Sequence, residues 1–305
     1  MTLTVVGSIA FDSVRTPFGE RERMLGGSAV HFSLAASFFT EVRVVGPVGE
    51  DFGPDEFAVL EERGVRTDDI ERVEGGETFF WRGHYEFDMN VAHTDDTQLN
   101  VFAEFEPKLS QASRQAEILF LANIQPELQS QVRAQCEDAR LAALDSMNLW
   151  IETAHDSLIS AIQGVDCVLI NDAEIRQLTR EPNLARAARA VMELGPQIIV
   201  SKQGEYGSAL FSEAGFFALP GFPLEDVRDP TGAGDSFAGG FLGFLDGRAK
   251  VDEAAVRQAM AYGTVLASFN VEEFGTERVQ RLTREEIDRR VAELQRMTQF
   301  ETLPV

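Results

Sequence analysis

Short apolar runs recur along the chain, and most of them are followed by a stretch with helical periodicity. Runs of this kind are typical of buried parallel strands when turn residues follow them. Their repeated alternation with helices predicts a parallel sheet that is covered by helices on both faces. The predicted strands cover residues 3–9, 42–48, 118–122, 141–144, 167–170 and 198–201.

The predicted helices alternate with these strands, and a hairpin precedes the last two helices. The helices cover residues 28–39, 55–63, 128–140, 151–162, 184–194, 252–269 and 284–300, and the hairpin covers 208–213 and 215–220. We therefore expect one α/β domain over residues 1–305, doubly wound, with a mostly parallel sheet flanked by helices.

The pattern changes over residues 69–106, where polar and apolar residues alternate and no convincing helix appears. Alternation of this kind marks strands that have one solvated face. We predict a small antiparallel sheet lying over the main domain, formed by about 69–106 together with a hairpin from about 11–25.

Charge and cysteine content indicate which partners and which cell compartment suit the protein. The net charge of −23 argues against nucleic acid as a partner, because a phosphate backbone would be repelled. Cys136 and Cys167 give no disulfide framework and fit a reducing compartment. No run of eighteen apolar residues suits a membrane span, and the first residues lack the charged region of a signal peptide. We expect a cytoplasmic protein with no membrane partner.

The clearest chemistry lies in the segment 229–241, which reads DPTGAGDSFAGGF. The turn formed by Gly232, Ala233 and Gly234 opens a helix and leaves backbone N–H groups unpaired. Together with the partial positive charge of the helix N-terminus, these groups suit a phosphoryl group in transfer. Asp235 at the end of the turn can accept a proton from an acceptor hydroxyl. The alternative interpretation is that Asp235 only caps the helix.

This segment resembles the C-terminal signature of the PfkB, or ribokinase-like, carbohydrate kinases, a family that includes ribokinase, fructokinases and several nucleoside kinases. The resemblance extends to the Gly-Gly motif at 26–29 and to the strand and turn at 45–53. It implies an ATP-dependent kinase that phosphorylates a hydroxyl of a sugar or polyol, with a nucleoside as the alternative acceptor. The predicted small sheet resembles the family's lid, which closes over the substrate and excludes water.

The resemblance implies four residues on the acceptor side. Gly26 and Gly27 let the substrate lie close to the backbone, and Asp12 stands where relatives place a carboxylate that grips hydroxyls. The alternative for Asp12 is an ordinary turn aspartate. His31 stands where many sugar kinases of the family have Asn, and it can donate to a hydroxyl or simply be satisfied by a neighbour.

Five residues are implied on the nucleotide side. Asn171 and Glu174 resemble the family's Asn-x-x-Glu motif, which orders Mg²⁺ and the phosphates through waters. The alternative is a helix cap with a solvated Glu174. Lys202, Gly204 and Gly207 match the loop that borders the nucleotide, where Lys202 either reaches a phosphate or lies at the rim.

Two further features depend on the resemblance. Some relatives bind K⁺ beside the anion turn, and Asp229 and Thr231 are suitably placed for it, so the implied cofactors are ATP, Mg²⁺ and, as an open alternative, K⁺. Asp145 and Asn148 only loosely resemble an Asp-x-Asn-x-Arg element of some sugar kinases, because the spacing is stretched and the Arg is absent.

Aromatic residues crowd one predicted lid strand, and two interpretations stay open. Large apolar groups on a thin sheet need cover, which favours a homodimer through the lid. Alternatively, the rings line a pocket for an aromatic base. A rival outside the enzyme class is a ligand-binding regulator built on a kinase fold. The aromatic residues are Phe80, Trp81, His84, Tyr85 and Phe87.

Overall fold

The structure is a computed structural model that describes residues 2–299. Within these residues a nine-stranded sheet has the order β13-β12-β11-β10-β9-β8-β1-β4-β5. The strands pair in parallel from β11 to β5, and only the β11–β12 and β12–β13 pairs are antiparallel, so β12 alone runs against the other strands. This confirms the mostly parallel sheet. The strands are β1 (Thr2–Val6), β4 (Glu41–Val48), β5 (Arg66–Arg72), β8 (Ile118–Leu121), β9 (Leu141–Asp145), β10 (Cys167–Asn171), β11 (Ile198–Lys202), β12 (Ser208–Ser212) and β13 (Gly215–Leu219).

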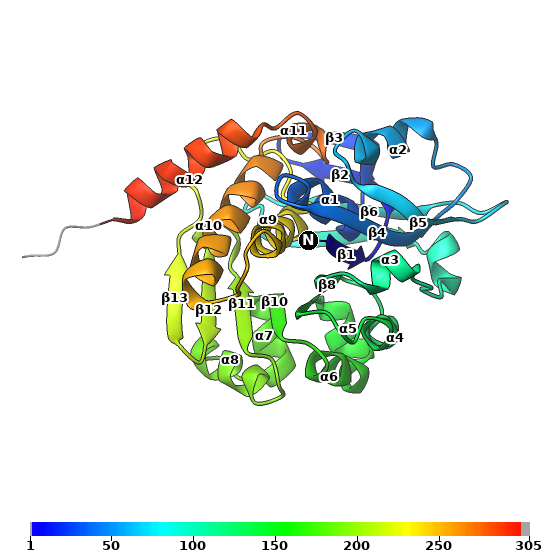
Figure 1. The fold of residues 1–305 in the computed structure, drawn as a ribbon. Coiled ribbons are helices and arrows are strands. Elements are labelled where there is room, and N and C mark those ends of the chain that lie inside the picture. The colour runs from blue at the N-terminus through cyan, green and yellow to red at the C-terminus, as the bar shows by residue number, and fades with distance from the viewer. Residues whose placement is uncertain (1, 300–305) are drawn as a thin grey trace, which may run out of the picture.

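Helices cover both faces of this sheet, with α1, α9 and α10 on one face and α4 to α8 on the other (Figure 1). The predicted doubly wound α/β architecture is therefore confirmed. The α-helices are α1 (Ser28–Ala36), α2 (Pro54–Glu61), α3 (Gln111–Arg114), α4 (Pro126–Gln135), α5 (Asn148–Thr153), α6 (His155–Gln163), α7 (Asp172–Thr179), α8 (Leu184–Met192), α9 (Ala233–Asp246), α10 (Glu253–Asn270), α11 (Glu277–Gln280) and α12 (Arg284–Thr298), and the 3₁₀ turns are η1 (Asn100–Glu104) and η2 (Gly204–Tyr206).

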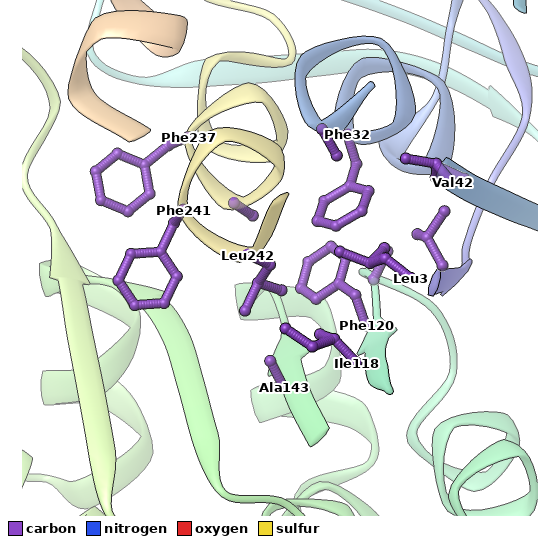
Figure 2. Close-up of a cluster of buried hydrophobic side chains, with 14 of the residues drawn as sticks. Leu3, Phe32, Val42, Ile118, Phe120, Ala143, Phe237, Phe241 and Leu242 are labelled. Carbon is purple, nitrogen blue, oxygen red and sulfur yellow. The ribbon is translucent and has the colours of Figure 1, made fainter. Parts of the chain in front are cut away.

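The buried strands place alternate side chains in two separate cores. Phe120 of β8 belongs to the cluster under α1 and α9, whereas its neighbour Leu119 belongs to the cluster under α4 to α8. Figure 2 shows Phe32 of α1 stacked on Phe120, with 4.4 Å between the ring centroids. A Cβ at Gly239 of α9 would lie 2.4 Å from the carbonyl oxygen of Phe32. The glycine-rich start of α9 therefore lets this helix pack closely against α1.

A second sheet has the order β3-β2-β6-β7 and is formed by β2 (Ala10–Thr16), β3 (Gly19–Gly26), β6 (Phe79–Tyr85) and β7 (Ala92–Gln98). It corresponds to the expected lid, but β2 and β6 pair in parallel, so the sheet is mixed and not purely antiparallel. The parallel pairing arises because the two hairpins come from separate parts of the chain and meet side by side.

The expected lid boundaries also need correction. Residues 66–72 form β5, which pairs with β4 at the edge of the large sheet, and residues 100–104 form η1. No residue of this edge strand is fully buried, so its sequence is mostly polar and lacks the apolar run of the central strands. The lid strands from this part of the chain therefore begin at Phe79 and end at Gln98.

The remaining differences concern element ends. The helix predicted over 151–162 is divided into α5 and α6, and the helix predicted over 128–140 ends at Gln135. The helix predicted over 284–300 includes one residue, 300, that lies outside the described range. Met1 and residues 301–305 of the expected domain also lie outside it. In residues 2–299, no helix is both long enough and apolar enough to cross a bilayer.

Candidate active site

The predicted chemical residues converge at one edge of the large sheet. Asp145, Asn171 and Lys202 are the last residues of the neighbouring parallel strands β9, β10 and β11. The start of α9 lies beside them, because a Cβ at Gly234 would be 3.1 Å from the Nζ atom of Lys202. The carboxyl ends of parallel strands are where ligands bind in open α/β sheets.

The turn before α9 has the conformation that an anion site needs. Gly232 adopts a left-handed conformation with φ of 75° and is the N-cap of α9. The N–H of Ala233 donates to the carbonyl of Pro230 at 3.1 Å, which closes the turn. Within the described chain the N–H groups of Gly232 and Gly234 have no acceptor. Two of the three predicted N–H donors are therefore free for an anion.

Asp229 is fully buried and holds the turn in place through hydrogen bonds. Its two carboxylate oxygens accept from the N–H groups of Thr231 and Gly275, each at 2.9 Å. Burial raises the pKa of Asp229, although these hydrogen bonds oppose the shift. Asp229 therefore ties the anion turn to the loop that follows α10.

Asp235 lies in the first turn of α9, whereas the N-cap residue of this helix is Gly232. Asp235 is therefore not the N-cap itself, although its carboxylate also bonds to its own backbone N–H. Burial raises the pKa of Asp235 to about 7, with Asp145 adding to the shift and Lys202 opposing it. A carboxylate with a pKa near neutrality is well matched to accept a proton from an alcohol.

Lys202 forms an ion pair with Asp145, with 2.5 Å between Nζ and Oδ2. Burial alone would lower the pKa of Lys202, but Asp145 and Glu174 together hold it above its usual value. Lys202 is therefore a fixed positive charge beside Gly234 and not a mobile group at the rim. The loose Asp-x-Asn-x-Arg similarity gave no role to Asp145, and the structure places it within the site.

Asn171 and Glu174 form a reciprocal cap at the start of α7. The N–H of Glu174 donates to Oδ1 of Asn171 at 2.7 Å, and the N–H of Asn171 donates to Oε2 of Glu174 at 3.0 Å. Glu174 is not simply solvated, since burial raises its pKa to about 7, with Lys202 opposing and Asp145 adding to the shift. Its Oε1 atom makes no capping bond and stays available to a ligand.

Gly204 and Gly207 border this edge of the sheet, and both have positive φ values of 56° and 102°. A Cβ at Gly204 would lie 2.5 Å from Oδ1 of Asn90, and one at Gly207 would lie 2.1 Å from the carbonyl oxygen of Leu219. The positive φ favours glycine at both positions, and the backbone around Gly207 also leaves no room for a side chain. The loop lies against the turn between β6 and β7.

Asp12 enters the site from the lid strand β2 and is 6% exposed. Its Oδ2 accepts from the N–H of Gly27 at 3.4 Å, and a Cβ at Gly26 would lie 2.0 Å from the same oxygen. Burial raises the pKa of Asp12 to about 7 against the effect of the Gly27 bond, and Asp229 and Asp235 add to the shift. The Gly-Gly motif therefore makes room for a carboxylate that shares the site with Asp235.

His31 is 2% exposed, and its Nδ1 lies 3.0 Å from Oδ1 of Asn270. The amide orientation of Asn270 follows from its Nδ2, which donates to the carbonyl of Thr231 at 2.7 Å. Nδ1 of His31 therefore carries the hydrogen, because Oδ1 can only accept. Burial lowers the pKa of His31 to about 4, with Asn270 opposing.

This tautomer leaves Nε2 of His31 with a lone pair, and the atom has no partner among residues 2–299. The ring also packs on the anion turn, because a Cβ at Gly232 would lie 2.3 Å from it. The Nδ1 atom of His31 is therefore satisfied by a neighbour, as one of the two expectations had it, and Nε2 can accept a hydrogen bond but not donate one. Asn270, which the sequence reasoning missed, also accepts from the hydroxyl of Ser236 at 3.0 Å and so joins His31 to the turn.

Comparison with known proteins identifies the family. The sequence profile described as pfkB family carbohydrate kinase matches residues 4–281. A cytidine kinase of Thermococcus kodakarensis is 28% identical over 261 residues, which cover 81% of this chain and 90% of that protein.

Two solved structures show the same fold. The nucleoside kinase of Burkholderia thailandensis in complex with inosine has a TM-score of 0.78 at 19% identity, covering 96% of this chain and 97% of that one. The ribokinase of Thermotoga maritima has a TM-score of 0.76 at 20% identity, covering 96% and 99%. With its sheet, its anion turn and the match over residues 4–281, this chain belongs to the pfkB family of carbohydrate kinases.

Proposed function

We propose that this protein transfers the γ-phosphoryl group of ATP to a hydroxyl of a small molecule, with Asp235 as the general base. The observation that carries the proposal is the meeting of three groups at one point. Asp235 lies beside the free N–H groups of the anion turn, and Lys202 lies against the same turn. Asp12 shares this site from the lid side, because Asp235 adds to the upward shift of its pKa.

The chemistry follows from these positions. Asp235 takes the proton of the acceptor hydroxyl, the acceptor oxygen forms a bond to the γ-phosphorus, and the bond to the β-phosphate oxygen breaks to release ADP. The N–H groups of Gly232 and Gly234 and the N-terminus of α9 stabilise the charge on the phosphoryl oxygens. Lys202 adds a full positive charge at the same turn. Asp12 and Nε2 of His31 accept hydrogen bonds from hydroxyls of the acceptor.

On the nucleotide side, the side chains of Asn171 and Glu174 suit Mg²⁺ that they contact through bound water and not directly. Among residues 2–299, no group of three carboxylate, imidazole or thiol side chains is arranged to hold a metal directly. Glu174 keeps one oxygen free beside Lys202, and Mg²⁺ commonly retains several waters when it binds with phosphates. We propose that Glu174 and Asn171 orient such waters, and that the ion neutralises phosphate charge when bound.

For a monovalent cation, Asp229 is the candidate ligand. Both of its oxygens already accept one N–H bond, but each carboxylate oxygen has a further lone pair. K⁺ bound there, next to Thr231, would hold the anion turn in place. Turnover in K⁺ compared with turnover in tetramethylammonium, at equal ionic strength, tests this part of the proposal.

Of the two acceptor classes, we propose the nucleoside over the sugar or polyol. Trp81 pairs in parallel register with Asp12, so the two side chains share one face of the lid. The six-membered ring of the indole covers Gly83, where a Cβ would be 2.3 Å from it, and its N–H donates to the hydroxyl of Thr94 at 3.2 Å. A fixed flat ring beside a hydroxyl-binding carboxylate suits a base attached to a ribose.

ADP release from Mg-ATP in the presence of nucleosides, sugars and polyols tests the function. We expect turnover with nucleosides, loss of turnover in Asp235→Asn with nucleotide binding retained, and a raised KM for the nucleoside in Trp81→Ala. Turnover with free sugars only would overturn the nucleoside assignment. A folded protein that binds ATP and phosphorylates none of these acceptors would support the regulator instead.

We also propose a homodimer through the lid and a cytoplasmic location. Large apolar side chains are exposed on or beside the lid, Phe18 by 57% and Phe87 by 94%. Such groups on a four-stranded sheet are typical of a surface that a second copy covers. Light scattering after size-exclusion chromatography tests the dimer, and Phe87→Ser should shift it to monomer. The two buried free cysteines fit a reducing cytoplasm, which also supplies ATP.

A further inference from the structure

One contact joins the lid directly to the anion turn. Tyr85 is the last residue of the lid strand β6, and Thr231 begins the turn. The hydroxyl of Thr231 donates to the phenol oxygen of Tyr85 at 3.3 Å, across 146 positions of sequence. Beyond β6, Nδ2 of Asn90 donates to Oε1 of Glu205 at 3.2 Å in the loop that contains Gly204. The lid therefore contacts both the catalytic turn and the predicted nucleotide loop.

The phenol of Tyr85 keeps a hydrogen that is free to be donated. Its oxygen already accepts from Thr231, and no acceptor for its hydrogen is found among residues 2–299. Burial raises the pKa of Tyr85 above its usual value, and Asp229, Asp12 and Asp235 add to the shift. The phenol therefore stays protonated at any pH at which the protein works.

We propose that Tyr85 is a catalytic residue carried by the lid, whose phenol donates a hydrogen bond to a non-bridging oxygen of the phosphoryl group in transfer. The inference rests on the phosphoryl transfer proposed above. The phenol stands beside Thr231, which precedes the N–H donors of the turn, so its free hydrogen can rotate toward the group that those donors bind. The acceptor hydroxyl, in contrast, gives its proton to Asp235 and needs no second donor.

The electrostatics of the site explain why such a donor is useful. The phosphoryl oxygens carry negative charge in the transition state, and three carboxylates lie close to the phenol. A neutral O–H donor offsets part of the repulsion between the phosphoryl oxygens and these carboxylates. A cationic side chain in the same place would instead pair with the carboxylates. Because the donor belongs to the lid, it reaches the phosphoryl group only when the lid lies over the site. Phosphoryl transfer is thereby coupled to lid closure, which limits the hydrolysis of ATP in an open site.

Tyr85→Phe tests the proposal, with Tyr262→Phe as the matched control, because the hydroxyl of Tyr262 donates to Asp288 on α12 at 3.4 Å, away from the site. We expect kcat of Tyr85→Phe to fall by about 100- to 1,000-fold, the size of effect of losing one transition-state donor. Affinity for Mg-ADP with aluminium fluoride and the acceptor, which mimics the phosphoryl group in transfer, should fall by a similar factor. Affinity for a non-hydrolysable ATP analogue should stay at the wild-type value, as should every parameter of Tyr262→Phe.

Three outcomes would overturn the inference. Wild-type kcat in Tyr85→Phe would show that the phenol does not act on the reaction. A raised acceptor KM with unchanged kcat and unchanged aluminium fluoride affinity would make Tyr85 only a closing contact of the lid. Absence of transfer by the wild-type enzyme itself would refute the proposed function and this inference with it. The melting temperature of Tyr85→Phe, measured beside that of Tyr262→Phe, shows whether a loss of kcat reflects unfolding.

Discussion

The ammonium of Lys202 lies 2.5 Å from Oδ2 of Asp145, and both side chains are largely buried, at 17% and 5% exposure. The pair joins the ends of β11 and β9 immediately beside Asp235. Its two members act on the pKa of Asp235 in opposite directions, Asp145 raising it and Lys202 lowering it. The ion pair therefore sets the acidity of the proposed base in addition to holding Lys202 against the anion turn.

Opposite shifts of the pH profile should follow from breaking this pair. A base acts when it is deprotonated, so kcat/KM falls as the pH drops below its pKa, which is about 7 for Asp235. Asp145→Asn removes the group that raises this pKa and should move the acidic limb to lower pH. Lys202→Gln should move it to higher pH, besides lowering the maximum rate. The measurement is kcat/KM between pH 5 and 9, roughly the range over which such groups titrate.

For the Lys202–Asp145 pair, the decisive measurement is the pH at which kcat/KM falls on the acidic side, and not the maximum value of kcat/KM. Asp68→Asn is the control, because Asp68 is exposed and pairs with Arg66 on the far edge of the sheet. Shifts of the same sign in Asp145→Asn and Lys202→Gln would contradict the assignment of Asp235 as the titrating base.

Gly232→Ala should disable the anion turn, and Gly64→Ala provides a matched control. Both glycines have nearly the same positive φ, 75° and 74°, but a Cβ at Gly64 meets nothing within 4 Å, whereas one at Gly232 meets the His31 ring at 2.3 Å. Gly64→Ala should lose about 1–2 kcal/mol of unfolding free energy from its backbone alone. Gly232→Ala should lose about 1–3 kcal/mol more from the clash, together with its turnover. Equal losses in urea unfolding would show that the ring does not constrain this turn.

Short-range patterns explain why the main sheet, the anion turn and the family could be predicted. Strands buried on both faces, such as β10, are short apolar runs whatever surrounds them, and the segment 229–241 carries its chemistry in consecutive residues. The predicted lid boundary was wrong because β5, at the edge of the large sheet, is mostly polar and lacks the apolar run of the central strands. A local pattern does not say which sheet a half-exposed strand joins.

The residues missed by sequence reasoning act through long-range contacts. Asn270 lies 239 positions from His31, and nothing near it in sequence marks it as the partner that fixes the histidine tautomer. A buried Asn at the end of the apolar helix α10 was the available signal, since a buried amide needs partners. Asp145 was discounted because its spacing departs from a motif, although the end of a central strand was reason enough to consider it.

Asp12→Asn should stabilise the protein at pH 8 while impairing acceptor binding. The pKa of Asp12 is about 7 in the folded protein and 3.8 as its ordinary value, so the folded state favours the protonated form. The ionised carboxylate therefore destabilises the fold above pH 7, and this penalty disappears as the pH falls toward 4, by on the order of 1.4 kcal/mol per pH unit. Urea unfolding from pH 5 to 8 (roughly this window) should show an advantage of Asp12→Asn that narrows on acidification. A difference independent of pH would refute the raised pKa, and exposed Asp68→Asn should show none.

Asn270→Ala should destabilise the fold far more than His31→Phe. Removing the amide leaves Nδ1–H of His31, the hydroxyl of Ser236 and the carbonyl of Thr231 without their partner, at about 1–3 kcal/mol for each group that stays buried and unpaired. His31→Phe keeps a ring on Gly232, and it removes a buried Nε2 lone pair that has no partner in the described chain. Its main effect should be a raised KM for the acceptor, because we propose that this lone pair receives an acceptor hydroxyl. Urea unfolding and acceptor KM distinguish the two variants. A His31→Phe protein as unstable as Asn270→Ala, with wild-type KM, would mean that His31 serves the fold and not the acceptor.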